Sequence, residues 1–241
     1  MDSQPLAVVT GAAHRLGKAF VLALARNGYA ILLHYRTSEV QAADTATEIR
    51  TLGVPVFLSQ EDLSEPENIA ALFAMVDKIP HPLKVLVNSA AIISAGDVRT
   101  LSVSDWDAAL NLNLRTPFLC AQEAAKRMTN GGLIVNVTDV GARKSWTRFP
   151  SYSVSKAGLE ALTKILARAL APVIRVNAIA PGLVLQSDLI SREEWNRLIE
   201  RMPLKRAASV QEIASALEFL LKNEYITGQT LGIDGGYSLL G

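Results

Sequence analysis

The chain has 241 residues, of which 49% are hydrophobic and 20% are charged, and its formal net charge is +1. This length and composition favour one globular domain with a large core. A charge balance so close to neutral gives no electrostatic support for nucleic acid or an anionic membrane as a partner.

The sequence argues against a disulfide, a metal site and a membrane span. Cys120 is the only cysteine, which excludes an internal disulfide and fits a reducing compartment; its apolar helical surroundings predict a buried structural thiol. The three histidines, His14, His34 and His81, lack the spacing of metal ligands. No apolar run approaches about 20 residues and the first residues show no signal-peptide pattern, so we expect a cytoplasmic protein.

The beginning of the chain has the pattern of a dinucleotide-binding loop. An apolar run over 5–10 predicts a buried strand, and after a glycine turn the residues from Ala19 onward have helical spacing. Gly11 allows the tight turn and Gly17 lets the helix pack near the strand, so that the helix N-terminus faces a pyrophosphate. Arg15 stands where a third glycine would help the backbone approach the cofactor.

The second predicted strand, 29–34, ends in a stretch that favours NADPH over NADH. An acidic residue at this place would bind the adenosine ribose hydroxyls of NAD, and there is none. Tyr35, Arg36, Thr37 and Ser38 stand there instead. The Arg36 cation and two hydroxyls suit a 2′-phosphate. The alternative is an ordinary strand end with a solvated arginine.

Apolar runs and helical patterns alternate along the rest of the chain. Further strands are expected at 54–58, 83–87, 133–137, 173–179 and 229–233. Helices are expected at 42–52, 66–76, 105–128, from Tyr152 to about 171, 191–201 and 210–222. Pro117 should disturb the long helix 105–128 locally. Continuous apolar strands are typical of buried parallel sheets.

We therefore predict the α/β fold class. The chain should form a single doubly wound Rossmann-type domain over 1–241, with a mostly parallel seven-stranded sheet and helices on both faces. The cofactor half would cover about 1–130 and the catalytic and substrate half about 131–241. The ligand should lie at the carboxyl ends of the strands.

Tyr152 and Lys156 stand four positions apart at the start of a helical pattern, so they share one helix face. A free tyrosine has a pKa of ~10, and lowering it by about three units requires roughly 4 kcal/mol. A cation about 4 Å away at an effective dielectric near 20 supplies about that much. The pair is therefore sufficient for a proton donor, although the same spacing is common on surface helices.

Over essentially its whole length the chain resembles the short-chain dehydrogenase/reductase family. The matching motifs are Thr10-Gly11-x-x-x-x-x-Gly17, Asp62-Leu63, Asn88-x-Ala90, Asn113, Tyr152-x-x-x-Lys156, Pro181-Gly182 and Asp234-Gly235-Gly236. The resemblance implies NAD(P) binding and hydride transfer to or from a C=O or C=N group. Tyr152 would donate the proton, and Lys156 would hold the nicotinamide ribose and lower the tyrosine pKa. Asn113 would help the proton relay, and Asp62 would meet the adenine edge.

The residues expected to contact the cofactor come from these motifs and from the end of the second strand. They are Gly11, Arg15, Leu16, Gly17, Tyr35, Arg36, Thr37, Ser38, Asp62, Leu63, Asn88, Ala90, Tyr152, Lys156, Pro181, Gly182 and Leu183.

Two departures from the family pattern narrow the resemblance. Most of the family has glycine at Arg15 and serine at Asp139. Both departures are similar to the pteridine reductase branch, which includes dihydromonapterin reductases. In that branch the arginine reaches the phosphates and the pterin, and the aspartate is catalytic. The resemblance thus implies Asp139, Tyr152, Lys156 and Asn113 as the catalytic residues.

Asp139 can also be judged on its chemistry. A ketone that becomes an alkoxide needs hydrogen-bond donors, whereas an ionised Asp139 would repel it and raise the Tyr152 pKa. A carboxylate can accept hydrogen bonds from the ring N–H and amino groups of a pterin, and a carboxylic acid can donate to a ring nitrogen. The alternative for Asp139 is a helix cap or turn after the fifth strand.

The expected substrate contacts are Arg15, Ile93, Asp139, Phe149 and Tyr152. Ile93 matches the position where pteridine reductases carry an aromatic residue that stacks on the pterin. Stacking contributes only about 1 kcal/mol beyond burial, so Ile93 could still cover the ring. Trp146 or Phe149 would provide an aromatic wall instead, or would be ordinary loop packing.

The sequence thus predicts an NADPH-dependent reductase of dihydropterins, or of dihydrofolate. One alternative is a carbonyl reductase, for instance of 3-ketoacyl thioesters, and another is an NADPH-binding sensor or assembly protein without turnover. The family implies a homotetramer that packs the tyrosine-bearing helix and the long helix before it. Leu159, Leu162, Ile165 and Leu166 would serve that interface or the core.

Overall fold

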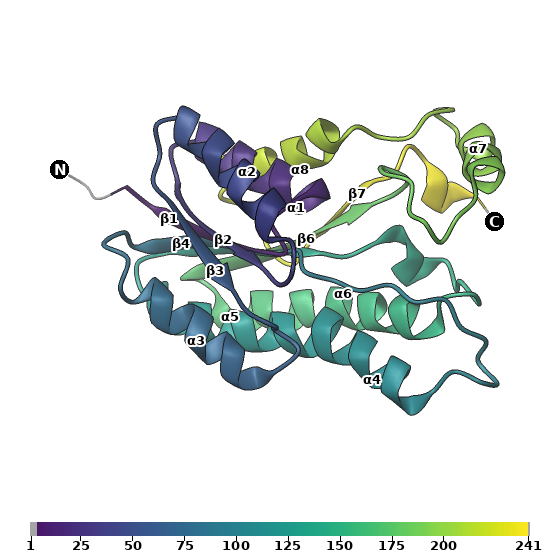
Figure 1. Ribbon diagram of the computed structural model, residues 1–241, viewed down its shortest axis with the longest axis horizontal. Coiled ribbons are helices and arrows are strands. Elements are labelled where there is room, and N and C mark those ends of the chain that lie inside the picture. The colour runs from purple at the N-terminus through teal and green to yellow at the C-terminus, as the bar shows by residue number, and fades with distance from the viewer. Residues whose placement is uncertain (1–3, 241) are drawn as a thin grey trace.

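The computed structural model describes residues 4–240, so Met1–Ser3 and Gly241 of the predicted domain lie outside the described part. Seven strands form one sheet in the order β3-β2-β1-β4-β5-β6-β7, and each strand runs parallel to its neighbours (Figure 1). The predicted doubly wound α/β fold is therefore confirmed, with a sheet that is parallel throughout. The strands are β1 (Leu6–Thr10), β2 (Ala30–Tyr35), β3 (Val56–Gln60), β4 (Leu83–Asn88), β5 (Gly132–Val137), β6 (Ile174–Pro181) and β7 (Thr230–Ile233).

Helices cover both faces of the sheet (Figure 1). One layer contains α1 (Arg15–Arg26), α2 (Glu39–Thr51) and α8 (Val210–Lys222). The other layer contains α3 (Pro66–Val76), α4 (Val103–Leu110), α5 (Thr116–Arg127) and α6 (Pro150–Leu170). The amphipathic α7 (Arg192–Arg201) buries no residue and lies beyond one end of the sheet, near the last turn of the described chain.

The alternation of side chains along a strand explains why the strands are apolar without interruption. In β1, Ala7 and Val9 belong to the core under α1 and α8, whereas Leu6 and Val8 belong to the core under α3 and α5. Successive side chains of a strand point to opposite faces, and here both faces are covered. Each central strand therefore contributes to two hydrophobic cores.

The long helix expected over 105–128 is present, with a local irregularity inside it. It consists of α4 and α5, joined by a π-helical turn at Asn111–Arg115. The turn directly precedes Pro117, which has no N–H to donate and whose ring crowds the carbonyl four residues earlier, that of Asn113, so the structure has a local disturbance where Pro117 predicted one. The Thr116 hydroxyl makes hydrogen bonds with the carbonyls of Leu63, at 2.5 Å, and Asn111, at 3.1 Å. This tertiary contact accompanies the wider turn.

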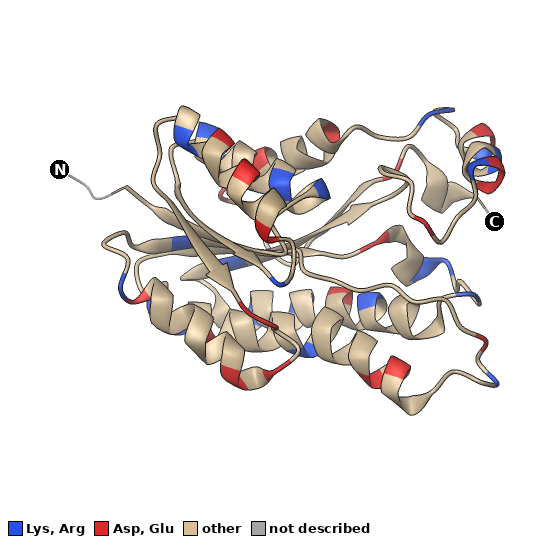
Figure 2. Cartoon of the chain, in the orientation of Figure 1, with Lys and Arg blue, Asp and Glu red and all other residues tan. Residues whose placement is uncertain are grey.

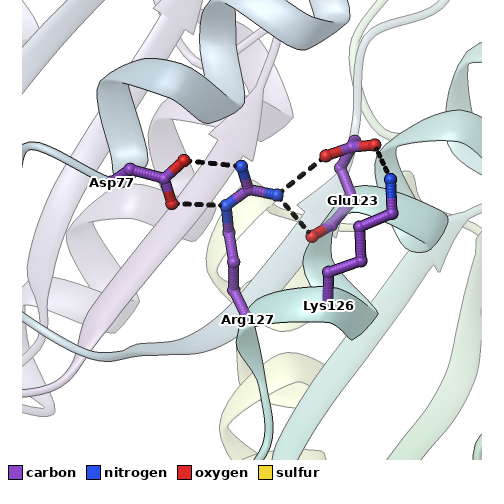
Figure 3. A network of polar contacts seen from close by, with 4 residues as sticks. All are labelled: Asp77, Glu123, Lys126 and Arg127. Atoms are coloured by element: carbon purple, nitrogen blue, oxygen red, sulfur yellow. Dashed lines mark hydrogen bonds and ion pairs between the residues drawn. The ribbon is translucent and has the colours of Figure 1, made fainter.

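A network of ion pairs fastens α5 to the end of α3 (Figure 3). We call it the Arg127 cluster; its members are Asp77, Glu123, Lys126 and Arg127. The Arg127 guanidinium binds both carboxylate oxygens of Asp77 at 2.7 Å and one of Glu123 at 2.8 Å. It also lies 5.2 Å from the centre of the Phe73 ring. The bidentate geometry fixes the orientation of the guanidinium.

The surface charges are mixed, as the near-neutral composition predicts. Figure 2 shows basic and acidic residues interspersed along the helices of both layers. Among the helices that the structure describes, none is long and apolar enough to cross a membrane. Within residues 4–240 there is no group of three or more His, Cys, Asp or Glu side chains that could hold a metal ion. Cys120 is fully buried, and burial raises the pKa of its thiol to about 12.

Candidate active site

A cavity of about 420 Å³ lies at the carboxyl ends of the strands, where the fold predicts a ligand. Residues from both predicted halves of the chain contribute to its wall. The predicted site residues that line it are Gly11, Arg15, Leu16, Gly17, Tyr35, Arg36, Thr37, Ser38, Asp62, Leu63, Ala90, Asp139, Tyr152, Lys156, Pro181 and Gly182. The structure thus brings together most of the positions expected from the motifs, and the role of each stays a prediction.

Some predicted residues do not line this cavity. Asn88 is 3% exposed and its amide donates to Asn136 instead. Leu183 is buried, and Val184 and Leu185 take its place in the wall. Phe149 is also buried, and Ile93, which is 39% exposed, lies outside the lining.

Several lining residues were not predicted, and most lie within or beside a predicted motif or at the end of a strand. They are Ala13, His14, His34, Glu61, Ser89, Ala91, Ile92, Leu112, Val137, Thr138, Val184 and Leu185. Their position at the carboxyl ends of the strands was the signal that could have identified most of them.

The glycine turn between β1 and α1 requires its glycines. Gly11 has a φ of +63°, and a Cβ there would lie 2.8 Å from the Ala90 Cα. A Cβ on Gly17 would lie 2.1 Å from the Gly11 carbonyl oxygen. Helix α1 has no side-chain cap and no acidic residue in its first turn, so its first N–H groups are available to an anion.

Arg15 adopts a φ of +54°, a left-handed conformation that costs a non-glycine residue about 1 kcal/mol. Its guanidinium donates to the carbonyls of Leu185, at 3.1 Å, and Gln186, at 3.5 Å. The resemblance implied that this side chain reaches the phosphates and the pterin. That role stays a prediction; in this structure the side chain joins the start of α1 to the segment after β6, and both line the cavity.

The end of β2 carries the residues expected at the 2′-phosphate. Arg36 lies 3.6 Å from the Asp62 carboxylate and is more than half exposed. Asp62 also accepts hydrogen bonds from the Ser64 N–H, at 3.0 Å, and hydroxyl, at 2.7 Å. These bonds and the nearby cation lower the pKa of Asp62. The basic and acidic groups are thus held at one end of the cavity, next to Thr37 and Ser38.

Asp139, Tyr152 and Lys156 form a second polar group, which we call the Asp139 cluster. The Tyr152 hydroxyl donates to Asp139 Oδ2 at 2.8 Å, and the Gly141 N–H donates to Oδ1 at 2.6 Å. Asp139 therefore caps the short helix Val140–Arg143 and contacts the tyrosine at the same time. Both interpretations of this aspartate from the sequence, cap and site residue, are compatible with the geometry.

Lys156 departs from the expected arrangement. Its ammonium donates to the Val137 carbonyl at 2.7 Å and lies 5.7 Å from the centre of the Tyr152 ring. The expectation that Lys156 lowers the Tyr152 pKa is wrong in this structure. Burial raises the Tyr152 pKa well above its usual value, and the Asp139 carboxylate raises it further.

Burial dominates the electrostatics of the whole cluster. It raises the pKa of Asp139, although the Gly141 N–H, the Tyr152 hydroxyl and the Lys156 cation oppose it. Burial likewise lowers the pKa of Lys156 to about 8, against the attraction of Asp139. All three groups are therefore pushed toward their neutral forms, as is common for groups that exchange protons.

Asn113 lies in the π-helical turn and is fully buried. Its side chain accepts from the Ile92 N–H at 2.9 Å and donates to the Ile92 carbonyl at 2.9 Å and to the Ser155 hydroxyl at 3.0 Å. Both amide hydrogens are thus engaged within the protein. Asn113 positions Ile92 in the cavity wall, and its predicted part in a proton relay stays a prediction.

The aromatic residues near Asp139 form a small group of their own. The Trp146 ring meets the Phe149 ring edge-on at 6.2 Å and lies 6.4 Å from the Tyr237 ring. A Cβ on Gly141 would lie 2.5 Å from the Trp146 ring and 3.0 Å from Asp139 Oδ1, so the indole lies beside the carboxylate. Phe149, buried against Trp146, is loop packing.

Comparisons with known proteins agree with this architecture. The family model described as "Enoyl-(Acyl carrier protein) reductase" matches residues 11–238. The crystal structure of FolM alternative dihydrofolate reductase 1 from Brucella suis in complex with NADP is 34% identical, with a TM-score of 0.94 over 100% of this chain and 98% of that one.

Two further relatives are similar over nearly their whole length. The 3-oxoacyl-(acyl-carrier-protein) reductase FabG of Staphylococcus aureus is 33% identical over 237 residues, covering 95% of this chain and 96% of the relative. A short-chain dehydrogenase/reductase from Serratia marcescens is 31% identical with a TM-score of 0.92, covering 99% of this chain and 100% of that one. The chain therefore belongs to the short-chain dehydrogenase/reductase family, whose members use a nicotinamide cofactor.

Proposed function

We propose that the protein reduces a C=N bond of a dihydropterin, or of dihydrofolate, with NADPH. The observation that carries the proposal is the hydrogen bond of 2.8 Å between the Tyr152 hydroxyl and the Asp139 carboxylate. A carboxyl group at this place can exchange a proton with the tyrosine and can bind the polar edge of a pterin. The likeness to FolM from Brucella suis, an alternative dihydrofolate reductase, supports the same substrate class.

The cavity residues fit NADPH. The uncapped N-terminus of α1 suits a pyrophosphate, and Arg36 with Thr37 and Ser38 suits a 2′-phosphate. When bound, the cofactor supplies a hydride. Lys156, at the cavity wall, would hold the nicotinamide ribose, as the family resemblance implies.

The protons would come from the Asp139 cluster. Tyr152 and Asp139 share a hydrogen bond, so a proton that leaves the phenol can be replaced from the carboxyl group. Burial favours the protonated form of Asp139. A protonated carboxyl group beside the reacting nitrogen is useful for C=N reduction, which consumes a proton. The same group, when ionised, would oppose the alkoxide formed from a ketone.

The second candidate function is reduction of a 3-ketoacyl thioester. The 33% identity to FabG of Staphylococcus aureus, a 3-oxoacyl reductase, favours it. The Asp139 carboxylate argues against it, because the tyrosine hydroxyl already donates to that carboxylate and only one donor is in place for an oxyanion. An NADPH-binding protein without turnover is the third alternative.

The test follows loss of reduced-nicotinamide absorbance by the purified protein with NADPH. Dihydrobiopterin, dihydromonapterin and dihydrofolate are compared with an acetoacetyl thioester, and NADH is the cofactor control. Turnover of a pterin or dihydrofolate with NADPH supports the proposal. Turnover of the thioester alone would contradict the proposal and favour the ketoacyl reductase function. Tight NADPH binding without turnover of any acceptor would favour a sensor.

The variant Asp139→Ser isolates the aspartate. We expect it to lose pterin reduction while NADPH affinity stays within about threefold, because Asp139 interacts with Tyr152 and not with the end of the cavity that carries Arg36. Asp62→Ser is the matched control: it should weaken cofactor binding and keep turnover at saturating NADPH. Unchanged pterin turnover in Asp139→Ser would remove this residue from the mechanism.

We also propose that the protein is a homotetramer that packs α5 and α6 against a second copy. Ile165 is 64% exposed and Phe118 is 42% exposed on these helices, whereas Leu159 and Leu166 are buried within the chain. Exposed large apolar side chains on two adjacent helices suit an interface. Light scattering after size-exclusion chromatography gives the mass directly, and a monomer would contradict the proposal.

A further inference from the structure

His34 is a buried imidazole that the proposed reaction does not use. It stands near the end of β2, where the chain reaches the cavity wall, and it is only 3% exposed. Its Nδ1 accepts a hydrogen bond from the Gly11 N–H at 3.1 Å, and its Nε2 lies 3.0 Å from the Glu61 carbonyl oxygen. The ring thus connects the glycine turn, β2 and the segment after β3.

The two partners determine the state of the ring. A backbone N–H can only donate, so Nδ1 must carry a lone pair toward Gly11. A carbonyl oxygen can only accept, so Nε2 must carry the proton toward Glu61. His34 is therefore neutral, with its hydrogen on Nε2. A doubly protonated ring would direct a second N–H against that of Gly11, and burial correspondingly lowers the His34 pKa to about 4.

We propose that neutral His34 is a positioning residue that holds the glycine turn in its cofactor-binding shape. The turn is anchored to His34 twice, because the His34 carbonyl also accepts from the Ala12 N–H at 2.8 Å. With Gly11 in a left-handed conformation, the imidazole fixes the direction in which its peptide N–H points. A preorganised turn binds a pyrophosphate with less loss of conformational freedom. The inference concerns the cofactor end and is independent of which substrate is reduced.

Other titratable or charged groups stand on the elements around the ring. On the segment after β3 these are Glu61 and Asp62, whose carboxylate favours the protonated imidazole. Arg36 directly follows β2, His14 belongs to the glycine turn, and Arg15 begins α1. A pH profile of cofactor binding alone would combine the titrations of all these groups. The test therefore compares variants at one pH and observes the ring itself.

The binding test uses NADPH fluorescence titration near pH 7.5 on the full chain. In His34→Asn the amide oxygen can replace Nδ1 as acceptor for Gly11, so we expect a Kd within about threefold of the parent. In His34→Gln the longer side chain can replace Nε2 toward Glu61 but leaves the Gly11 N–H without its acceptor. We expect NADPH to bind about five- to tenfold more weakly, the usual worth of one hydrogen bond. Any activity loss should appear in KM for NADPH and not in kcat.

The spectroscopic test uses protein labelled with ¹⁵N at histidine. We expect the His34 ring to show a protonated Nε2 and an unprotonated Nδ1, and to keep this pattern at pH 5, where an ordinary histidine is charged. Equal NADPH affinities of both variants, measured below their unfolding temperatures, would overturn the proposal and leave a purely structural histidine. So would a proton on Nδ1. Neither readout requires turnover, so failure of the pterin proposal would leave both results interpretable.

Discussion

The Arg127 cluster and the Asp139 cluster respond to their surroundings in opposite ways. In the first, hydrogen bonds between opposite charges are the largest cause of each shift: the pKa values of Asp77 and Glu123 fall and that of Arg127 rises. In the second, burial is the largest cause, and it drives all three members toward their neutral forms. The first cluster therefore stabilises the fold, and the second accepts a cost in stability for groups that can exchange protons.

The largest effect should come from Tyr152→Phe, which removes one hydroxyl from the Asp139 cluster. We expect kcat to fall by about 10²–10⁴, the usual contribution of a positioned proton donor. Steady-state kinetics with the accepted substrate measure it. Tyr225→Phe is the control, since that side chain is fully exposed and should leave kcat unchanged. Turnover of Tyr152→Phe within threefold of the parent would contradict a role in proton transfer.

Stability should rise with pH where Lys156 loses its proton. The Lys156 pKa is about 8 in the folded protein against 10.5 for the unfolded chain, so between these values the unfolded chain binds more protons. The free energy of unfolding should therefore gain about 3 kcal/mol from this group as the pH rises from 8 to 10.5, and this gain should be absent well below pH 8. Urea unfolding at both pH values measures it.

Lys156→Met should abolish this pH-dependent gain and also reduce activity. The exposed Lys164 lies on the same helix, and Lys164→Met should keep both the gain and the activity. Lys156→Met could instead lose as much stability near pH 7 as an ordinary core truncation does. That result would mean that the ammonium stabilises the fold, and it would contradict the comparison between the two clusters.

Arg127→Met should show the reverse pattern. It breaks the bidentate contact with Asp77 and the contact with the Phe73 ring, so we expect the free energy of unfolding to fall by about 1–2 kcal/mol. The value of kcat/KM should not change. Lys126→Met, which removes an exposed member of the same cluster, should cost less than about 0.5 kcal/mol. A change in kcat/KM for Arg127→Met would show that the two clusters are coupled.

The smallest effect should come from a position that belongs to neither cluster. Ile93 matches the stacking position of pteridine reductases, and Ile93→Phe would restore an aromatic ring there. If stacking adds about 1 kcal/mol to the binding free energy of the dihydropterin, its KM should fall about fivefold, with kcat and stability unchanged. Ile93→Leu should leave all three unchanged. A KM that does not respond to the aromatic ring would place the substrate away from Ile93.

The fold could be predicted because its signals are local. Buried parallel strands are uninterrupted apolar runs, and β1, at Leu6–Thr10, and β4, at Leu83–Asn88, lie within one residue of their predicted bounds. The glycine turn was predictable for a similar reason, since Gly11 and Gly17 leave no room for a side chain. Pro117 predicted a local disturbance of the long helix, but not its form as a π-helical turn, because that turn accompanies a hydrogen bond from Thr116 to the distant Leu63.

The sequence predicted which residues line the candidate site better than it predicted the partners of their side chains. Strand ends and motifs brought Asp139, Tyr152 and Lys156 to one cavity. The sequence spacing predicted that the Lys156 ammonium lies close to the tyrosine hydroxyl. In the structure the ammonium donates a hydrogen bond to the Val137 carbonyl, and the hydroxyl donates one to Asp139. His34 was missed as a site residue because its role depends on Gly11 and Glu61, which belong to other elements. Side-chain partners of this kind are set by tertiary packing.

The π-helical turn at Asn111–Arg115 sets the rotational phase between α4 and α5. Each residue of an α-helix advances the chain by about 100° around the axis. Deleting one residue here would restore a regular helix and still turn α4 by about that angle relative to α5. Ala109 would leave its buried position, and Asn113 would no longer meet Ile92. A deletion that removes no reactive group would then disable the cavity wall as surely as the loss of a catalytic side chain.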